Sequence, residues 1–178
     1  MALSATVYQF TVALSDVDRG VYQTLSVKAA RHPSESAEYL WTRVLAYCLE
    51  YREGIAFSRG LSEPDEPAVV VRDLTGTLQA WIEVGVPDAA RLHKAAKAAP
   101  RVAVYMHKDP APVLRALAEE KVHRAGEIEV CAFERDLIAA LVRRLERRVD
   151  LALSVTDRHA FLSLEGETLE ADLQRRLP

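Results

Sequence analysis

Three acidic residues, placed at two expected strands, have the chemistry needed to bind a divalent metal. Glu83 lies near the end of the apolar stretch 77–84, and Asp65 and Glu66 precede the stretch 68–72. A short turn joins the two stretches, so a carboxylate opening one strand is expected near a carboxylate closing its partner. Clustered carboxylates suit a hard cation such as Mg²⁺ or Mn²⁺. We therefore predict Asp65, Glu66 and Glu83 as metal ligands, with Glu66 favoured over Asp65 by its spacing to Glu83.

The position of Glu83 within its strand allows a second explanation. Side chains alternate across a strand, so Gln79, Trp81 and Glu83 are expected on one face. A carboxylate in a sheet covered on both faces is costly unless it is paired or bound to a metal. The same face could instead be partly solvated, with Glu83 meeting a nearby Arg. The sequence leaves both explanations open.

Further charged residues flank these carboxylates. Glu38 continues the apolar stripe of an expected helix and could face the sheet, although it could also simply favour the positive end of that helix. Arg91, Lys94 and Lys97 form a basic face on the helix after Gly85. A cation there could stabilise negative charge on a phosphate, although such a face is more often only solvated. The catalytic candidates are thus Glu38, Glu66, Glu83 and Lys94, and the substrate-binding candidates are Arg59, Gln79 and Arg91.

The order of predicted elements indicates an α/β fold with a mixed β-sheet flanked by helices. Two strands around the turn at 16–20 predict an N-terminal β-hairpin. Ser34 is the expected N-cap of a helix that runs to about residue 51, and Asp88 of one over 89–98. Strands and helices then alternate, which favours parallel strands with crossover helices. The remaining expected segments are strands at 68–72, 77–84, 102–106 and 128–133, helices at 110–120 and 136–145, and a closing hairpin of 149–154 with 160–164.

Length and composition predict one globular domain over residues 1–178. The chain has 49% hydrophobic and 28% charged residues, both ordinary for a globular protein. It lacks the basic start and apolar run of a signal peptide and any stretch long enough to span a membrane. Cys48 and Cys131 are expected as buried free thiols in a reducing compartment, which predicts a cytoplasmic protein. The net charge of −3 gives no overall attraction to nucleic acid, so such a partner would need a local basic patch.

The order helix Glu, acidic pair, strand Glu and helix Lys resembles the PD-(D/E)XK nuclease-like superfamily. Gly85 stands where the acid-x-Lys motif of that superfamily has its Lys, and Lys94 is a candidate migrated replacement. A closer resemblance is carried by the segments 1–6, Ala30-Arg31-His32-Pro33-Ser34-Glu35, Ser58-Arg59-Gly60-Leu61, Asp65-Glu66-Pro67, Trp81-Ile82-Glu83-Val84-Gly85 and Arg91-Leu92-His93-Lys94-Ala95. By these segments the chain is similar, over almost its full length, to the YaeQ family, which carries this variant fold.

The resemblance implies a PD-(D/E)XK-like core and a divalent-metal site. The leading hypothesis is a Mg²⁺-dependent nuclease-like phosphodiesterase acting on nucleic acid, in which Lys94 positions the attacking water or stabilises the phosphate. The alternative is a catalytically inactive module of the same fold that binds nucleic acid or protein, which the missing Lys at Gly85 and the acidic net charge favour. Hydrolysis of a smaller phosphate ester is a third possibility.

Overall fold

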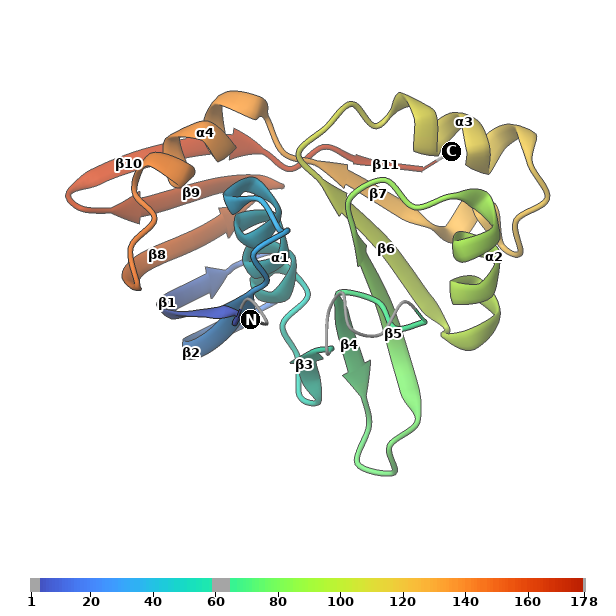
Figure 1. The fold of residues 1–178 in the computed structure, drawn as a ribbon, viewed down its shortest axis with the longest axis horizontal. Coiled ribbons are helices and arrows are strands. Elements are labelled where there is room, and N and C mark those ends of the chain that lie inside the picture. The colour runs from blue at the N-terminus through green and yellow to red at the C-terminus, as the bar shows by residue number, and fades with distance from the viewer. Residues whose placement is uncertain (1–3, 59–64, 178) are drawn as a thin grey trace.

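The computed structural model describes residues 4–58 and 65–177 and contains two separate mixed β-sheets (Figure 1). The first has five strands in the order β10-β9-β8-β1-β2. Its centre is the parallel pair of β1 and β8, and its other pairs are antiparallel. The strands are β1 (Thr6–Asp16), β2 (Val21–Arg31), β8 (Arg148–Thr156), β9 (His159–Leu164) and β10 (Glu167–Asp172).

The second sheet has six strands in the order β11-β7-β6-β5-β4-β3. The strands β5, β6 and β7 are parallel, and β4 and β3 extend the sheet in antiparallel fashion beyond β5. The strands are β3 (Ile55–Phe57), β4 (Val69–Arg72), β5 (Leu78–Val84), β6 (Arg101–Met106), β7 (Glu129–Ala132) and β11 (Arg175–Arg176).

One layer of helices lies between the two sheets, and another covers the outer face of the six-stranded sheet. Figure 1 shows α1 (Ala37–Leu49) lying between the sheets, with α4 (Arg135–Arg143) packed beside it. The largest apolar cluster fills this space between the sheets. The helices α2 (Ala89–Ala98) and α3 (Ala111–Glu119), followed by the 3₁₀ turn η2 (Ala125–Glu127), cover the opposite face of the six-stranded sheet over a second apolar cluster. The longest described helix has 13 residues, and no described helix is long and apolar enough to cross a bilayer.

The structure departs from the sequence predictions in three places. Two sheets are present where one was expected, because the N-terminal hairpin pairs with the C-terminal hairpin through β1 and β8 instead of joining the central strands. The strands β3, β10 and β11 were not predicted. The predicted N-cap Ser34 was wrong: the Oγ of Ser36 accepts the hydrogen bond from the Tyr39 N–H, whereas Ser34 pairs with the ring of His32.

Candidate functional site

The candidate residues meet where β5 ends and the chain turns into α2. Ala80, Ile82 and Val84 of β5 face α1, while Trp81 and Glu83 face α2, so the predicted alternation of side chains is confirmed for this part of the strand. Gly85 follows with φ of +102°, a backbone conformation that a residue with a Cβ adopts only with strain. The bend at Gly85 brings the first turn of α2 back over Glu83.

Glu83 is buried, with 4% of its surface exposed, and its Oε1 atom accepts two short hydrogen bonds. The indole Nε1 of Trp81 donates one at 2.6 Å, and the Nε of Arg91 donates the other at 2.6 Å. Burial raises the pKa of Glu83, and the hydrogen bonds from Trp81 and the charge of Arg91 counteract this only in part. Glu83 therefore has the Arg partner that one of the two sequence explanations anticipated.

Arg91 connects β5 to the acidic segment before β4. Its backbone N–H is fixed by the N-cap residue Asp88, whose Oδ1 accepts at 2.8 Å. From there its side chain reaches Glu83 and donates through Nη2 to the backbone carbonyl of Glu66 at 2.7 Å. The guanidinium of Arg91 thus lies between a carboxylate of β5 and the residues that open β4.

Lys94 lies one helical turn further along α2 and pairs with Asp65. The Nζ of Lys94 is 2.6 Å from Oδ1 of Asp65, and the two side chains are 53% and 88% exposed. The hydrogen bond and charge of Lys94 lower the pKa of Asp65, and Arg91 adds to that effect. An ion pair this exposed contributes little to stability, so it can open at low cost.

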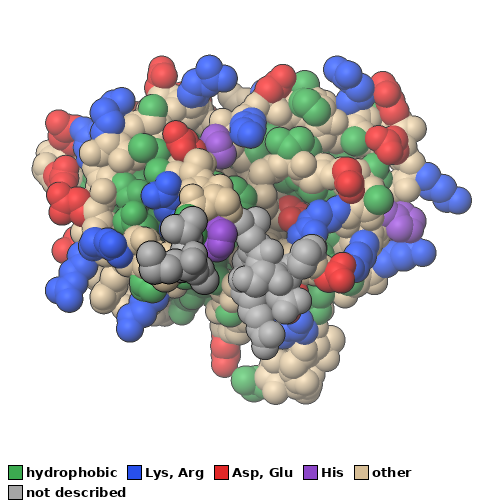
Figure 2. Space-filling model, in the orientation of Figure 1, with side chains coloured by type: hydrophobic (Ala, Val, Ile, Leu, Met, Phe, Trp, Pro, Cys, Tyr) green, Lys and Arg blue, Asp and Glu red, His purple; other side chains and the backbone are tan. Residues whose placement is uncertain are grey.

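The structure therefore brings together Asp65, Glu66, Glu83, Arg91 and Lys94, with Arg91 on Glu83 and Lys94 on Asp65. In the space-filling view, basic side chains gather over α2 with acidic side chains between them (Figure 2). Because Arg91 pairs with Glu83 and Lys94 with the exposed Asp65, this patch is suited to exchanging these carboxylate partners for an anionic ligand.

Two other candidates lie elsewhere, and a third is not described. Gln79 donates to Asp73 in the β4–β5 turn, about 13 Å along the strand from Glu83. Glu38 lies half-buried in the first turn of α1, and its backbone N–H contributes most to lowering the pKa of its carboxyl. The candidate Arg59 lies outside the described residues.

Tyr39 and His107 also border this region, and sequence reasoning missed both. The ring of Tyr39 approaches Gly85, and burial raises the pKa of its hydroxyl, with smaller effects from Glu83 and Arg91. His107 follows β6 directly, and its Nδ1 lies 3.2 Å from the Oγ1 of Thr42. Burial lowers the pKa of His107. A His directly after a parallel strand was the available signal, since ligands of open α/β sheets bind beyond the carboxyl ends of the strands.

The raised pKa of Glu83 predicts a pH-dependent stability difference between the wild type and Glu83→Gln. Because the folded state holds the proton of Glu83 more tightly than the unfolded chain, the contribution of this group to stability is fully present below its ordinary pKa of 4.5 and is lost as pH rises through the folded pKa. The free energy of unfolding of wild type minus that of Glu83→Gln should therefore decrease with rising pH across this window. Urea unfolding at a series of pH values measures it, and a difference that grows with pH would contradict the assignment.

The oxygen atoms at this site have the chemistry that a hard divalent cation needs. Mg²⁺ is usually held by one or two carboxylates and completes its shell with water and substrate phosphate. The carboxylates of Asp65, Glu66 and Glu83 are donors of that kind, although Lys94 is bonded to Asp65 and Arg91 to Glu83 in this structure. Within residues 4–58 and 65–177, no group of three or more His, Cys, Asp and Glu side chains is arranged to hold a metal ion. Binding of a metal would therefore require the ion pairs to rearrange.

Comparison with known proteins gives a consistent family match. The family model described as YaeQ protein matches residues 1–173. The uncharacterized protein YaeQ of Escherichia coli is 32% identical over 174 residues, which is 97% of this chain and 96% of that protein, and its Salmonella typhi counterpart gives the same figures. The crystal structure of YaeQ protein from Pseudomonas syringae matches with a TM-score of 0.86 and 32% identity over 96% of this chain and 95% of that one. The YaeQ structure from Xanthomonas axonopodis pv. citri gives 0.88 and 29% over 98% and 99%.

Proposed function

The chain belongs to the YaeQ family, and we propose that it is a divalent-metal-dependent phosphodiesterase acting on nucleic acid, with a variant PD-(D/E)XK nuclease-like core. The observation that carries this proposal is the convergence of Glu83, the Asp65-Glu66 segment and Lys94 around Arg91. These residues come from two neighbouring antiparallel strands and the following helix, the order in which that superfamily presents its acidic and basic groups.

The backbone at Gly85 supports the proposal that the lysine has migrated. Gly85 occupies the lysine position of the acid-x-Lys motif, and its φ of +102° disfavours any residue with a side chain. Lys94 reaches Asp65 from the next element instead, at 2.6 Å. In this proposal Lys94 supplies the cation to the acidic residues from α2, and the bend at Gly85 after β5 is retained.

In the proposed mechanism, Glu83 with Asp65 or Glu66 would hold Mg²⁺ or Mn²⁺. A bound metal would lower the pKa of its water and neutralise charge on the scissile phosphate. A substrate phosphate would compete with Asp65 for the exposed ammonium of Lys94, which leaves the carboxylate of Asp65 available as a ligand. Arg91 would keep Glu83 oriented through the hydrogen bond from its Nε.

The role of Lys94 can be tested against a neighbouring lysine. Lys94→Gln should lower the rate constant of metal-dependent cleavage about a hundredfold, the loss expected when a donor to the transition-state charge is removed. Lys97→Gln removes a charge from an exposed position on the same helix and should leave the rate unchanged. Cleavage of labelled single- and double-stranded DNA and RNA, with Mg²⁺ or Mn²⁺ and with EDTA, measures the effect. Equal losses in both variants would mean that Lys94 acts only through general charge.

A second candidate function is a catalytically inactive module that binds nucleic acid or protein. The short Arg91–Glu83 contact favours it, because a guanidinium 2.6 Å away already neutralises the buried carboxylate that a metal would need. The same assay separates the two functions. Metal-dependent cleavage that EDTA stops supports the enzyme, whereas binding of an oligonucleotide without cleavage under any metal condition supports the module.

A further inference from the structure

A second charged pocket lies where the two sheets meet, at the opposite end of α1 from Glu83. It has a volume of about 320 Å³ and is bordered by the turns after β1 and β8, the start of β7, and the C-terminal strand β11. Glu129 stands at the amino end of β7, whereas Glu83 lies near the carboxyl end of the parallel strand β5. The pocket is therefore separate from the proposed active site. Its charged lining residues are Asp16, Asp18, Arg19, Glu129, Arg158 and Arg175.

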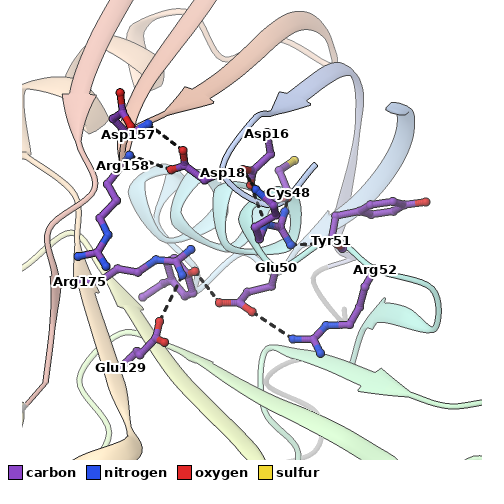
Figure 3. Close-up of polar contacts among 12 residues, drawn as sticks. Asp16, Asp18, Cys48, Glu50, Tyr51, Arg52, Glu129, Asp157, Arg158 and Arg175 are labelled. Atoms are coloured by element: carbon purple, nitrogen blue, oxygen red, sulfur yellow. Dashed lines mark hydrogen bonds and ion pairs between the residues drawn. The ribbon is translucent and has the colours of Figure 1, made fainter. Parts of the chain in front are cut away.

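The acidic groups of the pocket are already bonded to other parts of the protein. Asp16 accepts from the backbone and the guanidinium of Arg19, which in turn donates to the carbonyls of Cys48 in α1 and Tyr51 just beyond it. Asp18 accepts the backbone N–H groups of Asp157 and Arg158, each at 2.8 Å (Figure 3). Asp16 and Asp18 are therefore engaged locally and form an ion pair with neither Arg158 nor Arg175, whose described acidic partner is Glu129.

The guanidinium of Arg158 has no hydrogen-bond or ion-pair partner within the described residues. The side chain of Arg158 lines the pocket and extends from its turn towards the strand that carries Arg175 (Figure 3). Asp157 and Arg158 both have positive φ, 52° and 60°, where Asn-Gly is the usual choice for a two-residue turn. The two hydrogen bonds that Asp18 accepts hold this strained turn in place, and they thereby fix the position of the Arg158 backbone from which its side chain extends.

Arg175 offers further donors from the floor of the pocket. Within the described residues its side chain donates one hydrogen bond, from Nη1 to Oε2 of Glu129 at 3.3 Å, and that carboxylate is shared with Arg101. Burial lowers the pKa of Arg175, but Tyr105, Glu50 and Glu129 outweigh this and raise it, so the guanidinium stays charged. Because a guanidinium has five N–H donors, most of those on Arg175 are available to a ligand.

We propose that this pocket binds the phosphate group of a small phosphorylated molecule, with Arg158 and Arg175 donating to its oxygens. Guanidinium groups match phosphate in charge and in the fork-like geometry of their donors. The rest of the lining, from Val155, Leu173 and Leu177, provides an apolar wall for the organic part of the ligand. The volume fits the lower end of the range for small-molecule sites.

Calorimetric titration of inorganic phosphate and phenyl phosphate into the full-length protein tests this proposal. Each probe should bind saturably, with phenyl phosphate the tighter because of the apolar wall. Arg158→Gln and Arg175→Gln should each weaken binding by about tenfold or more, since a hydrogen bond between charged groups is lost. Arg176→Gln is the matched control, because Arg176 is exposed on the same short strand and donates to Gln174. It should bind both probes as the wild type does.

Several outcomes would overturn the proposal. They are no saturable binding of either probe, unchanged affinity in Arg158→Gln, or loss of binding in Lys94→Gln, which would place the phosphate at the proposed active site. Preferential binding of malonate would replace phosphate by a dicarboxylate as the ligand. If Arg175→Gln does not fold, Arg158→Gln decides alone, because Arg158 lies in an exposed turn and glutamine there keeps the same backbone demand.

Discussion

Replacement of Glu83 by glutamine should reduce divalent-metal-dependent cleavage of nucleic acid by at least about a thousandfold. A metal contributes several kcal/mol of charge stabilisation, and about 1.4 kcal/mol corresponds to a tenfold change in rate. Glutamine keeps the shape of the side chain and can still accept from the Trp81 indole, so the change acts mainly on charge. Single-turnover cleavage at saturating Mg²⁺ or Mn²⁺ measures the effect.

Two controls separate this loss of activity from a loss of structure. Glu119→Gln removes an exposed carboxylate of α3 and should leave cleavage unchanged. The unfolding midpoint of Glu83→Gln should show that the variant is folded at the assay temperature. Cleavage by folded Glu83→Gln at the wild-type rate would exclude Glu83 from the catalytic machinery.

Loss of Glu50 should destabilise the protein by about 3–5 kcal/mol, the cost of removing one partner of a buried ion pair. Glu50 is 2% exposed at the end of α1 and accepts two hydrogen bonds from Arg101, at 2.7 and 2.9 Å. The hydroxyl of Tyr105 donates a third at 2.7 Å. Glu50→Ala would leave the buried hydroxyl of Tyr105 without its acceptor and Arg101 with Glu129 alone as its acidic partner. Urea unfolding of Glu50→Ala measures the change.

Glu53→Ala is the matched control, since Glu53 is exposed and only three residues away; it should change the free energy of unfolding by no more than about 0.5 kcal/mol. Burial acts to raise the pKa of Glu50, but Arg101 and Tyr105 outweigh it and the net shift is downward. The contribution of Glu50 is therefore present above its ordinary pKa of 4.5 and is lost as pH falls through the folded pKa. A loss below about 1 kcal/mol for Glu50→Ala at neutral pH would contradict this account.

Elements with local signals were predicted well. The helix α2 has the bounds that were expected, because Asp88 supplies an N-cap and the apolar spacing that follows is helical. The N-terminal hairpin is confirmed with its turn at residues 17–20. By contrast, the division into two sheets depends on the pairing of β1 with β8, more than 130 residues later, and no local pattern reports it.

The sequence pointed to the residues that meet at the end of β5, but not to their pairing. Sequence reasoning proposed Lys94 as the cation that returns to Glu83, and the structure places Arg91 on Glu83 and Lys94 on Asp65. The two basic residues differ by one helical turn, so the assignment depends on how far α2 extends beyond the end of β5, which spacing alone does not determine. The network around Glu50 was missed for a similar reason, since Arg101 is 51 residues away in sequence.

Calorimetric titration of Mn²⁺ into the wild type and Glu83→Gln tests the central claim most directly. The titration is run with and without a phosphorothioate oligonucleotide, with the heat of the oligonucleotide alone subtracted, because Mg²⁺ and Mn²⁺ sites can need substrate phosphate to complete their shell. The proposed phosphodiesterase predicts saturable Mn²⁺ binding in the wild type that is lost in Glu83→Gln. Absence of binding in the wild type under both conditions, or equal binding in the two proteins, would contradict it and leave the inactive binding module as the function.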